Sequence, residues 1–502
     1  MSITHSIDLI PLGIHLQVDD GGSLETALAE HGVEFPCGGA GICRGCRVRV
    51  LEGRLPVTPE MEEAFTPAEL AAGWRLACRA RAGGPLRLEI AQWASPVLTD
   101  DSRLVFEPGE GCAIAIDVGT TTLVAQMIDR STGAVVAVET ALNPQIVHGA
   151  DVMSRIQFAV SGGGARLAGL IREALGRMLA GMPRRESVRA VMLAGNTVMH
   201  HLFCGLEVGP LAGAPFETPH SGERFFTPRE LGWDLPDSAS VRFLPCLGSF
   251  VGSDILAGIL ATGIHEHAGL AALIDLGTNG EIVVGGAGKL LCASTAAGPA
   301  FEAGGIRMGM RAASGAIAHV GVRNGSLECR VLGGAAPRGI CGSGLVDAAA
   351  AGLATGAILP SGRIAGGAAE LRLDPPVYLT QADLRELQLA KGAVAAGVRI
   401  LAARWNARPS DLDAVWLAGA FGNYLNLTSA RRIGLLESHL SRVAPAGNTA
   451  LRGVKMLLLA PARAEQWISG IRSRVEHAPL ASDPAFQDVF VDCLAFPDQT
   501  EA

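Results

Sequence analysis

The chain has 502 residues, of which 49% are hydrophobic and 18% charged, a composition typical of a globular protein with about two to four domains. Its net charge of −8 argues against binding to nucleic acid or to an anionic membrane, because both need a basic surface. The N-terminus has no basic, apolar leader, and no uncharged stretch reaches the ~18 residues of a membrane span, so we expect a cytoplasmic protein.

The first 90 residues carry the elements of a small β-rich domain. Alternating apolar residues at 7–10 and 14–18 predict a β-hairpin, and Ser23 is a good N-cap for a helix over 24–31 that Gly32 ends. A strand is expected at 47–51 and another at 85–90. Between them, Thr66-Pro-Ala-Glu69 has the pattern of a capping box at the start of a short helix.

Four cysteines of this region, Cys37, Cys43, Cys46 and Cys78, have the spacing C-x5-C-x2-C followed by a single distant cysteine. The spacing differs from the plant-type ferredoxin pattern only by one extra residue in the first gap. The glycines of the loop leave backbone N–H groups free to approach cluster sulfurs. The pattern predicts a 2Fe–2S cluster bound by these four thiolates, with Cys78 placed where a β-grasp fold returns the chain.

Three other interpretations of the cysteines are weaker. A zinc site favours two C-x2-C pairs, and here there is one. Disulfides are disfavoured in a reducing compartment, and core cysteines rarely lie in so glycine-rich a loop. The arginines around the ligands are either ordinary surface charge, or they bind an acidic partner or tune the reduction potential of the cluster. They are Arg44, Arg47, Arg49, Arg75 and Arg79.

Residues 91–112 are predicted to be a linker, because they carry Pro96, Pro108, Gly109 and Gly111 and show little periodicity. We expect this linker to be a tether that lets the cluster domain change position. The alternative is that 102–106 forms an ordered strand fixed against the rest of the protein.

Two internal repeats organise the remaining chain. The segment 116–124, Ile-Asp-Val-Gly-Thr-Thr-Thr-Leu-Val, recurs as Ile-Asp-Leu-Gly-Thr-Asn-Gly-Glu-Ile-Val at 274–283, and Ala-Val-Met-Leu-Ala-Gly at 190–195 recurs as Ala-Val-Trp-Leu-Ala-Gly at 414–419. The same motifs in the same order indicate duplicated halves, the second longer by about 66 residues. Each half is expected to run strand, Gly-Thr turn, strand, helices and a strand that ends at Leu-Ala-Gly.

An Asp-x-Gly-Thr turn between two strands places backbone N–H groups and hydroxyls around phosphates. Its aspartate can hold Mg²⁺ through water, because Mg²⁺ keeps several waters and takes few carboxylates. Two such hairpins facing each other predict a nucleotide bound between the halves.

This architecture resembles the superfamily of actin, sugar kinases and heat-shock chaperones, with two ribonuclease-H-like halves. The resemblance implies a multi-domain α/β protein in which a β-grasp ferredoxin-like domain (1–90) and a linker (91–112) precede the first ATPase half (113–265), the second half (266–475) and a C-terminal extension (476–502).

The resemblance also implies site residues. Asp117 and Asp275 would position Mg²⁺, and Asp254, at the start of the first connecting helix, would orient the attacking water; its alternative role is to interact with the helix dipole. The residues expected to bind ATP are Gly119, Thr120, Thr121, Thr122, Gly277, Thr278, Asn279, Gly280, Glu281, Gly342, Ser343, Gly344, Lys391, Gly419, Ala420, Phe421 and Gly422. For Lys391 a solvated helix position is the alternative, and for the glycines at 342 and 344 it is close packing.

Taken together, the motifs resemble one family, the reductive activators of corrinoid proteins. They are Phe-Pro-Cys…Cys78, Asp-Val-Gly-Thr-Thr-Thr, Asn143-Pro-Gln…Asp-Val-Met-Ser-Arg155, Leu-Ala-Gly-Asn-Thr-Val-Met-His200, Asp-Leu-Gly-Thr-Asn-Gly-Glu281, Gly-Ile-Cys-Gly-Ser-Gly344 and Leu-Ala-Gly-Ala-Phe-Gly422. Members use ATP to return cob(II)amide to cob(I)amide on a methyl-transferring corrinoid protein.

The resemblance implies ATP, Mg²⁺ and a 2Fe–2S cluster as cofactors. The implied partners are a corrinoid protein and a low-potential electron donor such as a ferredoxin, flavodoxin or reductase, with homodimerisation left open. One departure is expected: longer members insert a middle domain after the linker, whereas here Asp117 follows Cys78 by 39 residues.

Three other functions are compatible with parts of the pattern. A carbohydrate or acid kinase with a redox-regulatory domain would turn over a small acceptor, and a redox sensor would use the nucleotide as a structural ligand. An activator of acyl-CoA dehydratases carries its cluster cysteines within the ATPase fold, so the separate ferredoxin-like domain argues against it.

Overall fold

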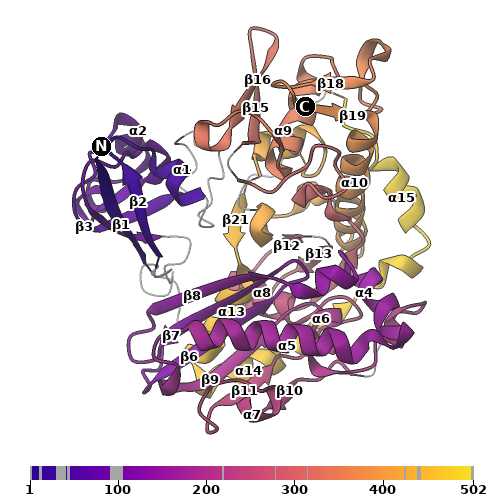
Figure 1. Ribbon diagram of the computed structural model, residues 1–502. Helices are drawn as coiled ribbons and strands as arrows, with labels where there is room; N and C mark the ends of the chain where they lie inside the picture. The colour runs from indigo at the N-terminus through magenta and orange to yellow at the C-terminus, as the bar shows by residue number, and fades with distance from the viewer. Residues whose placement is uncertain are drawn as a thin grey trace.

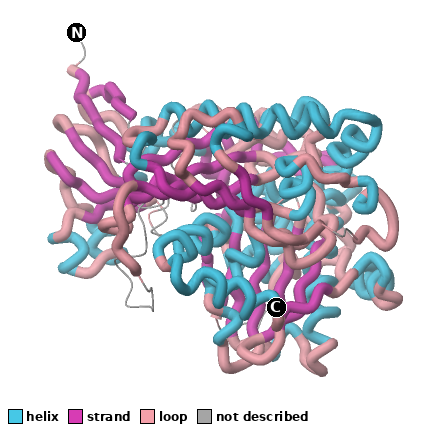
Figure 2. Tube along the Cα trace, turned by 90° about the horizontal axis from the view of Figure 1, so that it is seen from below, coloured by secondary structure: helices cyan, strands magenta, loops and turns pink. Residues whose placement is uncertain are grey.

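The computed structural model describes residues 3–10, 14–29, 41, 46–90, 106–217, 220–277, 279–313, 315–422, 425–437 and 442–498. The predicted cluster ligands Cys37 and Cys43, Thr278 and the linker residues 91–105 lie outside this description. Figure 1 shows a small N-terminal domain beside a larger body built on two sheets, and helices flank the strands of the larger body (Figure 2).

The N-terminal domain is a five-stranded sheet with strand order β2-β1-β5-β3-β4, in which β1 runs parallel to β5. This is the strand order of a β-grasp fold, as predicted. Its elements are β1 (Thr4–Ile10), β2 (Ile14–Asp19), α1 (Leu24–Ala29), β3 (Arg47–Glu52), α2 (Pro59–Ala64), α3 (Pro67–Ala71), β4 (Trp74–Leu76) and β5 (Leu86–Ile90).

Local sequence determines much of this domain. The apolar residues that alternate along β1, Ile7 and Leu9, are buried against the helices. The predicted capping box is present, since the backbone N–H of Thr66 donates to Glu69 Oε2 (2.8 Å) and that of Glu69 donates to Thr66 Oγ1 (3.3 Å).

The larger body contains the predicted duplication. One sheet has the order β10-β11-β9-β6-β7-β8 and the other β21-β20-β12-β13-β14-β22. In the first sheet, the antiparallel strands β6–β8 are followed by β9, which runs parallel to β6, and by β11, which runs parallel to β9. In the second sheet, the antiparallel strands β12–β14 are followed by β20, which runs parallel to β12, and by β21, which runs parallel to β20. The two halves therefore share a ribonuclease-H-like topology, to which β10 and β22 add one edge strand each.

The strands of the first sheet are β6 (Cys112–Val118), β7 (Thr122–Asp129), β8 (Val135–Leu142), β9 (Val188–Ala194), β10 (Arg224–Phe226) and β11 (Ser240–Phe243). Those of the second are β12 (Ala271–Leu276), β13 (Gly280–Gly285), β14 (Leu290–Thr295), β20 (Ala414–Ala418), β21 (Val443–Gly447) and β22 (Val475–His477). The central strands are nearly continuous apolar runs because both faces of each sheet are covered.

The helices of the first half are α4 (Val152–Phe158), α5 (Gly164–Gly181), α6 (Thr197–Cys204) and α7 (Pro228–Leu231). The longer second half contains β15 (Ala316–Arg323), β16 (Ser326–Val331), β17 (Gly339–Ile340), α9 (Gly342–Ala354), β18 (Glu370–Arg372), β19 (Tyr378–Thr380), α10 (Gln381–Ala403), α11 (Gly419–Gly422) and α12 (Leu427–Arg432). No helix among the described residues is both long enough and apolar enough to cross a membrane.

Two helices join the halves. Helix α8 (Ser253–Thr262) packs closely on α13 (Thr449–Leu459), where a side-chain carbon on Gly453 would lie 2.0 Å from the carbonyl oxygen of Ala257. Residues of α8, α13 and α14 (Pro461–Arg472) share one apolar cluster with strands of both sheets. The segment 449–472 of the second half thus returns to pack against the first half.

The end of the predicted linker is fixed to the larger body. The backbone N–H of Glu107 donates to the carbonyl oxygen of Leu459 (2.8 Å), and Glu107 Oε2 accepts from the N–H of Ala462 (3.2 Å). Phe106 packs into the cluster around α8 and α13. The prediction of a tether is thus wrong for residues 106–111.

The segment predicted as a C-terminal extension belongs to the second half. It contributes β22 and α15 (Phe486–Asp492), which packs along α10. The side-chain amide of Gln388 on α10 donates to the carbonyl oxygen of Leu494 (3.0 Å), so the chain end is held by buried polar contacts.

The N-terminal domain contacts the second half through α1. Thr26 Oγ1 donates to the carbonyl oxygen of Gly333 (3.3 Å) in the short helix η9 (Leu332–Gly334). Helix α1 also packs on η1 (Ala77–Arg79), the turn that carries Cys78. One apolar cluster spans the contact: Leu24 and Leu28 of α1 with Ala316, Ala318, Leu332 and Cys341.

Candidate functional site

The two predicted phosphate hairpins occupy equivalent places in the two sheets. Asp117 at the end of β6 lies opposite Ala194 of β9, and Asp275 at the end of β12 lies opposite Ala418 of β20. Each aspartate is therefore beside the Leu-Ala-Gly end of the neighbouring parallel strand. The identical register explains why both motifs repeat together.

Close backbone approaches require glycine at the two turns. A side-chain carbon on Gly119 would lie 2.4 Å from the carbonyl oxygen of Thr122, which closes the first hairpin. Gly419 has φ +83°, and a side-chain carbon there would lie 2.6 Å from Asp275 Oδ1. A larger residue at 419 would displace the second aspartate.

Asp254 lies in the first turn of α8, against the first half. Its Oδ1 accepts from the N–H of Ile255 (2.8 Å), and the N–H of Ser253 donates to the carbonyl oxygen of Gly195 (2.9 Å). The two interpretations of Asp254 are therefore compatible, because the residue is at a helix N-terminus and also beside the hairpin aspartates.

Four carboxylates from both halves share this region. Burial raises the pKa of Asp117 to about 6, although the Asn448 amide opposes the shift, and burial with the charges of Asp117 and Glu302 raises that of Asp275 to about 7. Burial and the charge of Asp275 raise the pKa of Asp254, and burial with the charges of Asp254 and Asp275 raises that of Glu281 well above its usual value. The charges of Asp117, Asp254 and Asp275 thus disfavour ionisation of neighbouring carboxyls.

This arrangement suits a hydrated cation. No group of three His, Cys, Asp or Glu side chains in the described part of the chain is arranged to chelate a metal directly. Mg²⁺ usually keeps waters and shares substrate phosphates, so carboxylates that act through water are compatible with it. Asp117, Asp254 and Asp275 could hold such an ion between the two hairpins.

Residues that sequence analysis missed complete the first hairpin. Asn448, the N-cap of α13, donates from Nδ2 to Asp117 Oδ2 (2.7 Å). Asn196, directly after Leu-Ala-Gly, donates from Nδ2 to Thr120 Oγ1 (3.0 Å), and Thr121 Oγ1 donates to Glu302 Oε2 (3.4 Å). Asn196 could have been predicted as a site residue because it directly follows the repeated Leu-Ala-Gly motif. Asn448 and Glu302 have no such signal in the sequence.

The glycine-rich segment at the start of α9 is closely packed. A side-chain carbon on Gly342 would lie 1.7 Å from the carbonyl oxygen of Phe301, and one on Gly344 would lie 2.2 Å from that of Ile317. Ser343 Oγ donates to the carbonyl oxygen of Ala318 (3.0 Å). These contacts agree with the packing alternative.

The Leu-Ala-Gly-Ala-Phe-Gly motif is placed beside that segment. The Phe421 ring stacks on the Phe301 ring with centroids 4.9 Å apart, and a side-chain carbon on Gly422 would touch the backbone of Leu417. In the second hairpin, Gly277 and Gly280 flank the turn, and Asn279 hydrogen-bonds Glu281. Both motifs therefore meet near Asp275.

Lys391 does not have the solvated position that was the alternative to ATP binding. Its side chain is buried (1% exposed), its Nζ donates to the carbonyl oxygen of Ala495, and it lies 5.4 Å from the Phe496 ring centroid. Burial lowers the pKa of the amine to about 8. The prediction of a solvated lysine is wrong, and the ammonium group is directed to the C-terminal segment.

The two described cluster cysteines lie together in the N-terminal domain. Arg47 pairs with Leu76 across β3 and β4, and the N–H of Ala77 donates to the carbonyl oxygen of Cys46 (3.1 Å). This ladder brings Cys46 and Cys78, both buried, to one end of the sheet. Buried thiols on two adjacent turns fit the cysteine ligation of a 2Fe–2S cluster.

The described arginines near these cysteines make local contacts. The Arg47 guanidinium lies over the Trp74 ring (5.5 Å), Arg75 donates to the carbonyl oxygens of Leu55, Leu70 and Trp74, and Arg79 lies 3.6 Å from Glu60. Arg44 is outside the described residues. These contacts agree with ordinary structural charge.

Comparisons with known proteins agree with this division of the chain. Family models match at residues 7–83 (2Fe-2S iron-sulfur cluster binding domain), 112–267 (RACo middle region) and 269–502 (C-terminal domain of RACo the ASKHA domain). The corrinoid activation enzyme RamQ of Eubacterium limosum is 34% identical over 420 residues, which cover 77% of this chain and 70% of RamQ. The chain belongs to the RACo family.

Two further relatives support this assignment. The [Co(II) methylated amine-specific corrinoid protein] reductase of Methanosarcina barkeri is 26% identical, with 76% of each chain covered. The solved structure of a reductive activator for corrinoid, iron-sulfur protein has a TM-score of 0.70 and 25% identity and covers 98% of both chains. The predicted ferredoxin-like domain and actin-like ATPase fold are confirmed.

The middle region of the family matches residues 112–267, and the absence of a further domain between the linker and Asp117 stays a prediction. That region is the half that carries Asp117 and Asp254.

We predict that the purified protein binds about two irons and two sulfides, as a plant-type cluster requires. Cys46→Ser should lose the cluster because it removes a thiolate ligand, whereas Cys329→Ser, in the second half, should keep it. Iron, acid-labile sulfide and visible absorbance measure both. One equivalent of zinc without sulfide would contradict the assignment.

Asp117→Ala and Asp275→Ala are each predicted to abolish ATP hydrolysis, because each removes a carboxylate facing the cation. Asp254→Ala should still bind ATP but hydrolyse it about 100-fold more slowly, the scale of a lost proton-accepting group. Exposed Asp237→Ala is the control, and melting temperature and cluster content check the fold. Normal turnover in Asp117→Ala and Asp275→Ala would contradict the role of the hairpins.

The raised carboxyl pKa values predict a pH-dependent stability. The folded protein retains protons that the unfolded chain has already lost, so the free energy of unfolding should fall as the pH rises from about 5 to about 8 without divalent cations. Asp275→Asn should flatten this fall and Asp237→Asn should not, as measured by thermal melting. Equal curves for both variants would show that the shifts do not govern stability.

Proposed function

We propose that this protein is an ATP-dependent reductive activator of a corrinoid methyl-transfer protein, which it returns from cob(II)amide to cob(I)amide by donating one electron. The observation that carries the proposal is that a ferredoxin-type domain is packed on a duplicated nucleotide-binding fold within one chain. Membership of the RACo family supports the same activity. The proposal includes Mg²⁺, a cytoplasmic location and a low-potential donor such as a ferredoxin, flavodoxin or reductase; a homodimer remains part of the hypothesis.

The ligand residues fit their expected group. Cys46 and Cys78, with Cys37 and Cys43 from sequence, would hold a 2Fe–2S cluster, which supplies a one-electron relay when bound. The β3–β4 ladder holds two of these thiols at one end of the sheet. The chain's own contribution is to place them next to α1, which contacts the ATPase.

The nucleotide site would act through its two hairpins. Asp117 and Asp275 would orient the waters of Mg²⁺ from opposite sides, and Asp254 would accept a proton from the water that attacks the terminal phosphate. ATP and water then give ADP and phosphate, and no electron is exchanged at this site. ATP hydrolysis and electron transfer therefore take place at separate sites, and the protein must couple them through a change of conformation.

Energies explain why such coupling is needed. A plant-type 2Fe–2S centre has a reduction potential of about −400 mV. Cob(II)amide is harder to reduce. Each ~59 mV deficit lowers the equilibrium of a one-electron step tenfold. The nucleotide can shift that equilibrium only if it binds two conformations of the protein with different affinity. Closure of the halves must therefore also change how tightly the protein binds the corrinoid protein.

A structural route for this coupling exists. Strand β15 contacts the cluster domain through Ala316 and Ala318 and accepts a hydrogen bond from Ser343 at the start of α9 through the Ala318 carbonyl oxygen. A shift of α9 relative to the second hairpin would therefore reach α1. We propose that the cluster domain leaves this contact to meet the corrinoid protein.

The test follows the absorbance change from cob(II) to cob(I) on candidate corrinoid proteins, with a chemical reductant and with or without ATP. ATP is expected to raise the reduced fraction, and Asp117→Ala with a full cluster should lose the ATP effect but keep cluster reduction. Cob(I) formation that is equal with and without ATP would contradict ATP dependence. Phosphorylation of a sugar or organic acid instead would favour a kinase.

A further inference from the structure

A buried arginine of the first half lies behind the first phosphate hairpin. Arg155 on α4 is fully buried (0% exposed), and the sequence motif that contains it has no role in the mechanism above. Its Nη2 donates to the carbonyl oxygen of Thr120 (2.7 Å), its Nε to that of Gly149 (2.9 Å) and its Nη1 to Gln145 Oε1 (3.2 Å). Its Nη1 also donates to Met199 Sδ (3.4 Å), so all four acceptors are neutral.

Asn143 holds the same turn from the same segment. Its Nδ2 donates to the carbonyl oxygen of Gly119 (2.9 Å), and its backbone N–H donates to that of Thr121 (2.9 Å). Three successive carbonyl groups of the turn, those of 119, 120 and 121, are thus bonded to the segment that contains Asn143 and Arg155.

The geometry of the peptide bond gives this arrangement a consequence. In a planar trans peptide the C=O of one residue and the N–H of the next point in opposite directions. Fixing the carbonyls of Gly119 and Thr120 on one side therefore directs the N–H groups of Thr120 and Thr121 to the other. Within the described residues neither N–H group donates a hydrogen bond, which leaves both available to an anion.

The charge of Arg155 has no ion-pair partner in the described part of the chain. The nearest acidic influence is Asp151, whose carboxylate is bonded to the backbone N–H of Ser154 (2.9 Å) and to its hydroxyl (2.6 Å). Burial lowers the pKa of the Arg155 guanidinium to about 10, so it remains charged at neutral pH. A buried cation without a counter-charge is costly unless an anion approaches it.

We propose that Arg155 is a positioning residue for the nucleotide phosphates: it holds the Gly119–Thr121 turn with its N–H groups facing them and leaves its own charge to be balanced by them. The proposal rests on the proposed function, because it assumes that a nucleotide binds at this hairpin. Bound phosphates reduce the cost of the buried charge, and the charge strengthens the hydrogen bonds of the turn that reach the phosphates.

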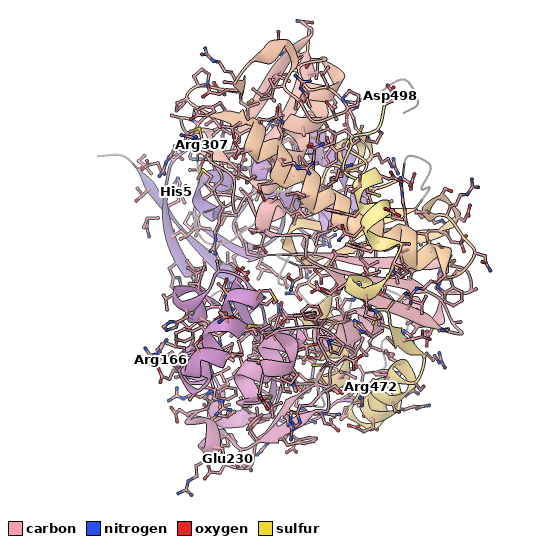
Figure 3. All side chains as sticks on the ribbon, turned by 90° about the vertical axis from the view of Figure 1, so that its right-hand side faces the viewer. His5, Arg166, Glu230, Arg307, Arg472 and Asp498 are labelled. Carbon is pink, nitrogen blue, oxygen red and sulfur yellow. The ribbon has the colours of Figure 1, made fainter. Side chains whose placement is uncertain are left out.

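The experiment separates this role from a merely structural one. Arg155→Met should weaken the binding of Mg-ATP and Mg-ADP about tenfold or more, the scale of a lost charge-assisted hydrogen bond. Exposed Arg166 on α5 (Figure 3) provides the control Arg166→Met, which should bind both nucleotides as the wild type does. Calorimetry measures affinity, and thermal melting without nucleotide measures stability.

Gln145→Glu provides the sharper test, and it remains available if Arg155→Met does not fold. It places a carboxylate against Arg155 in nearly the same shape but removes the hydrogen bond that Gln145 Nε2 donates to the carbonyl oxygen of Leu167 (2.9 Å), so the Mg-ATP affinity should fall by more than the stability without nucleotide does. A structural contact alone would move stability and affinity together. Unchanged affinity, or a parallel loss of both, overturns the proposal, whereas a wild-type protein that binds neither nucleotide overturns the proposed function instead.

Discussion

The crowding of four carboxylates where the two halves meet is the constraint on which the rest of this molecule depends. Asp117 and Asp254 come from the first half and Asp275 and Glu281 from the second. Burial raises the pKa of all four, and the charges of Asp117, Asp254 and Asp275 raise the pKa of neighbouring carboxyls further. Full ionisation at neutral pH therefore requires a cation. A divalent ion that arrived with a nucleotide would satisfy this requirement and attract both halves, so the proposed function would couple ligand binding to closure electrostatically.

The two-fold repetition of a sheet explains how carboxylates from distant parts of the chain come to face one another. In both halves the aspartate follows a fully buried strand and pairs in register with the alanine of Leu-Ala-Gly. Helices α8 and α13 then cross between the sheets at a glycine contact, and α13 supplies Asn448 to the aspartate of the opposite half. The link between the halves is thus made both by packing and by a hydrogen bond at the site itself.

The cluster domain lies where the proposed closure of the halves would act on it. Helix α1 is in contact with the turn that bears Cys78 on one side and with η9 of the ATPase on the other. Because β15 and Ser343 connect η9 with the start of α9, the contact surface and the nucleotide site share structural elements. Residues 106–111 are held to the larger body by hydrogen bonds at this end of the connection.

The sequence by itself determined the features that depend on local pattern. Cysteine spacing indicated the ferredoxin-type domain, and two repeated motifs indicated the duplicated sheets and the aspartates, because turn chemistry and strand burial are encoded over a few residues. Only the tertiary structure decided where long-range partners lie. It placed Lys391 against the C-terminal segment, Asn448 on Asp117 and Arg155 behind Thr120, contacts between residues 35 to 331 positions apart that no local periodicity specifies. Such contacts depend on how whole elements pack, since a side chain's partner is fixed only when burial and shape bring its distant neighbours within hydrogen-bonding distance.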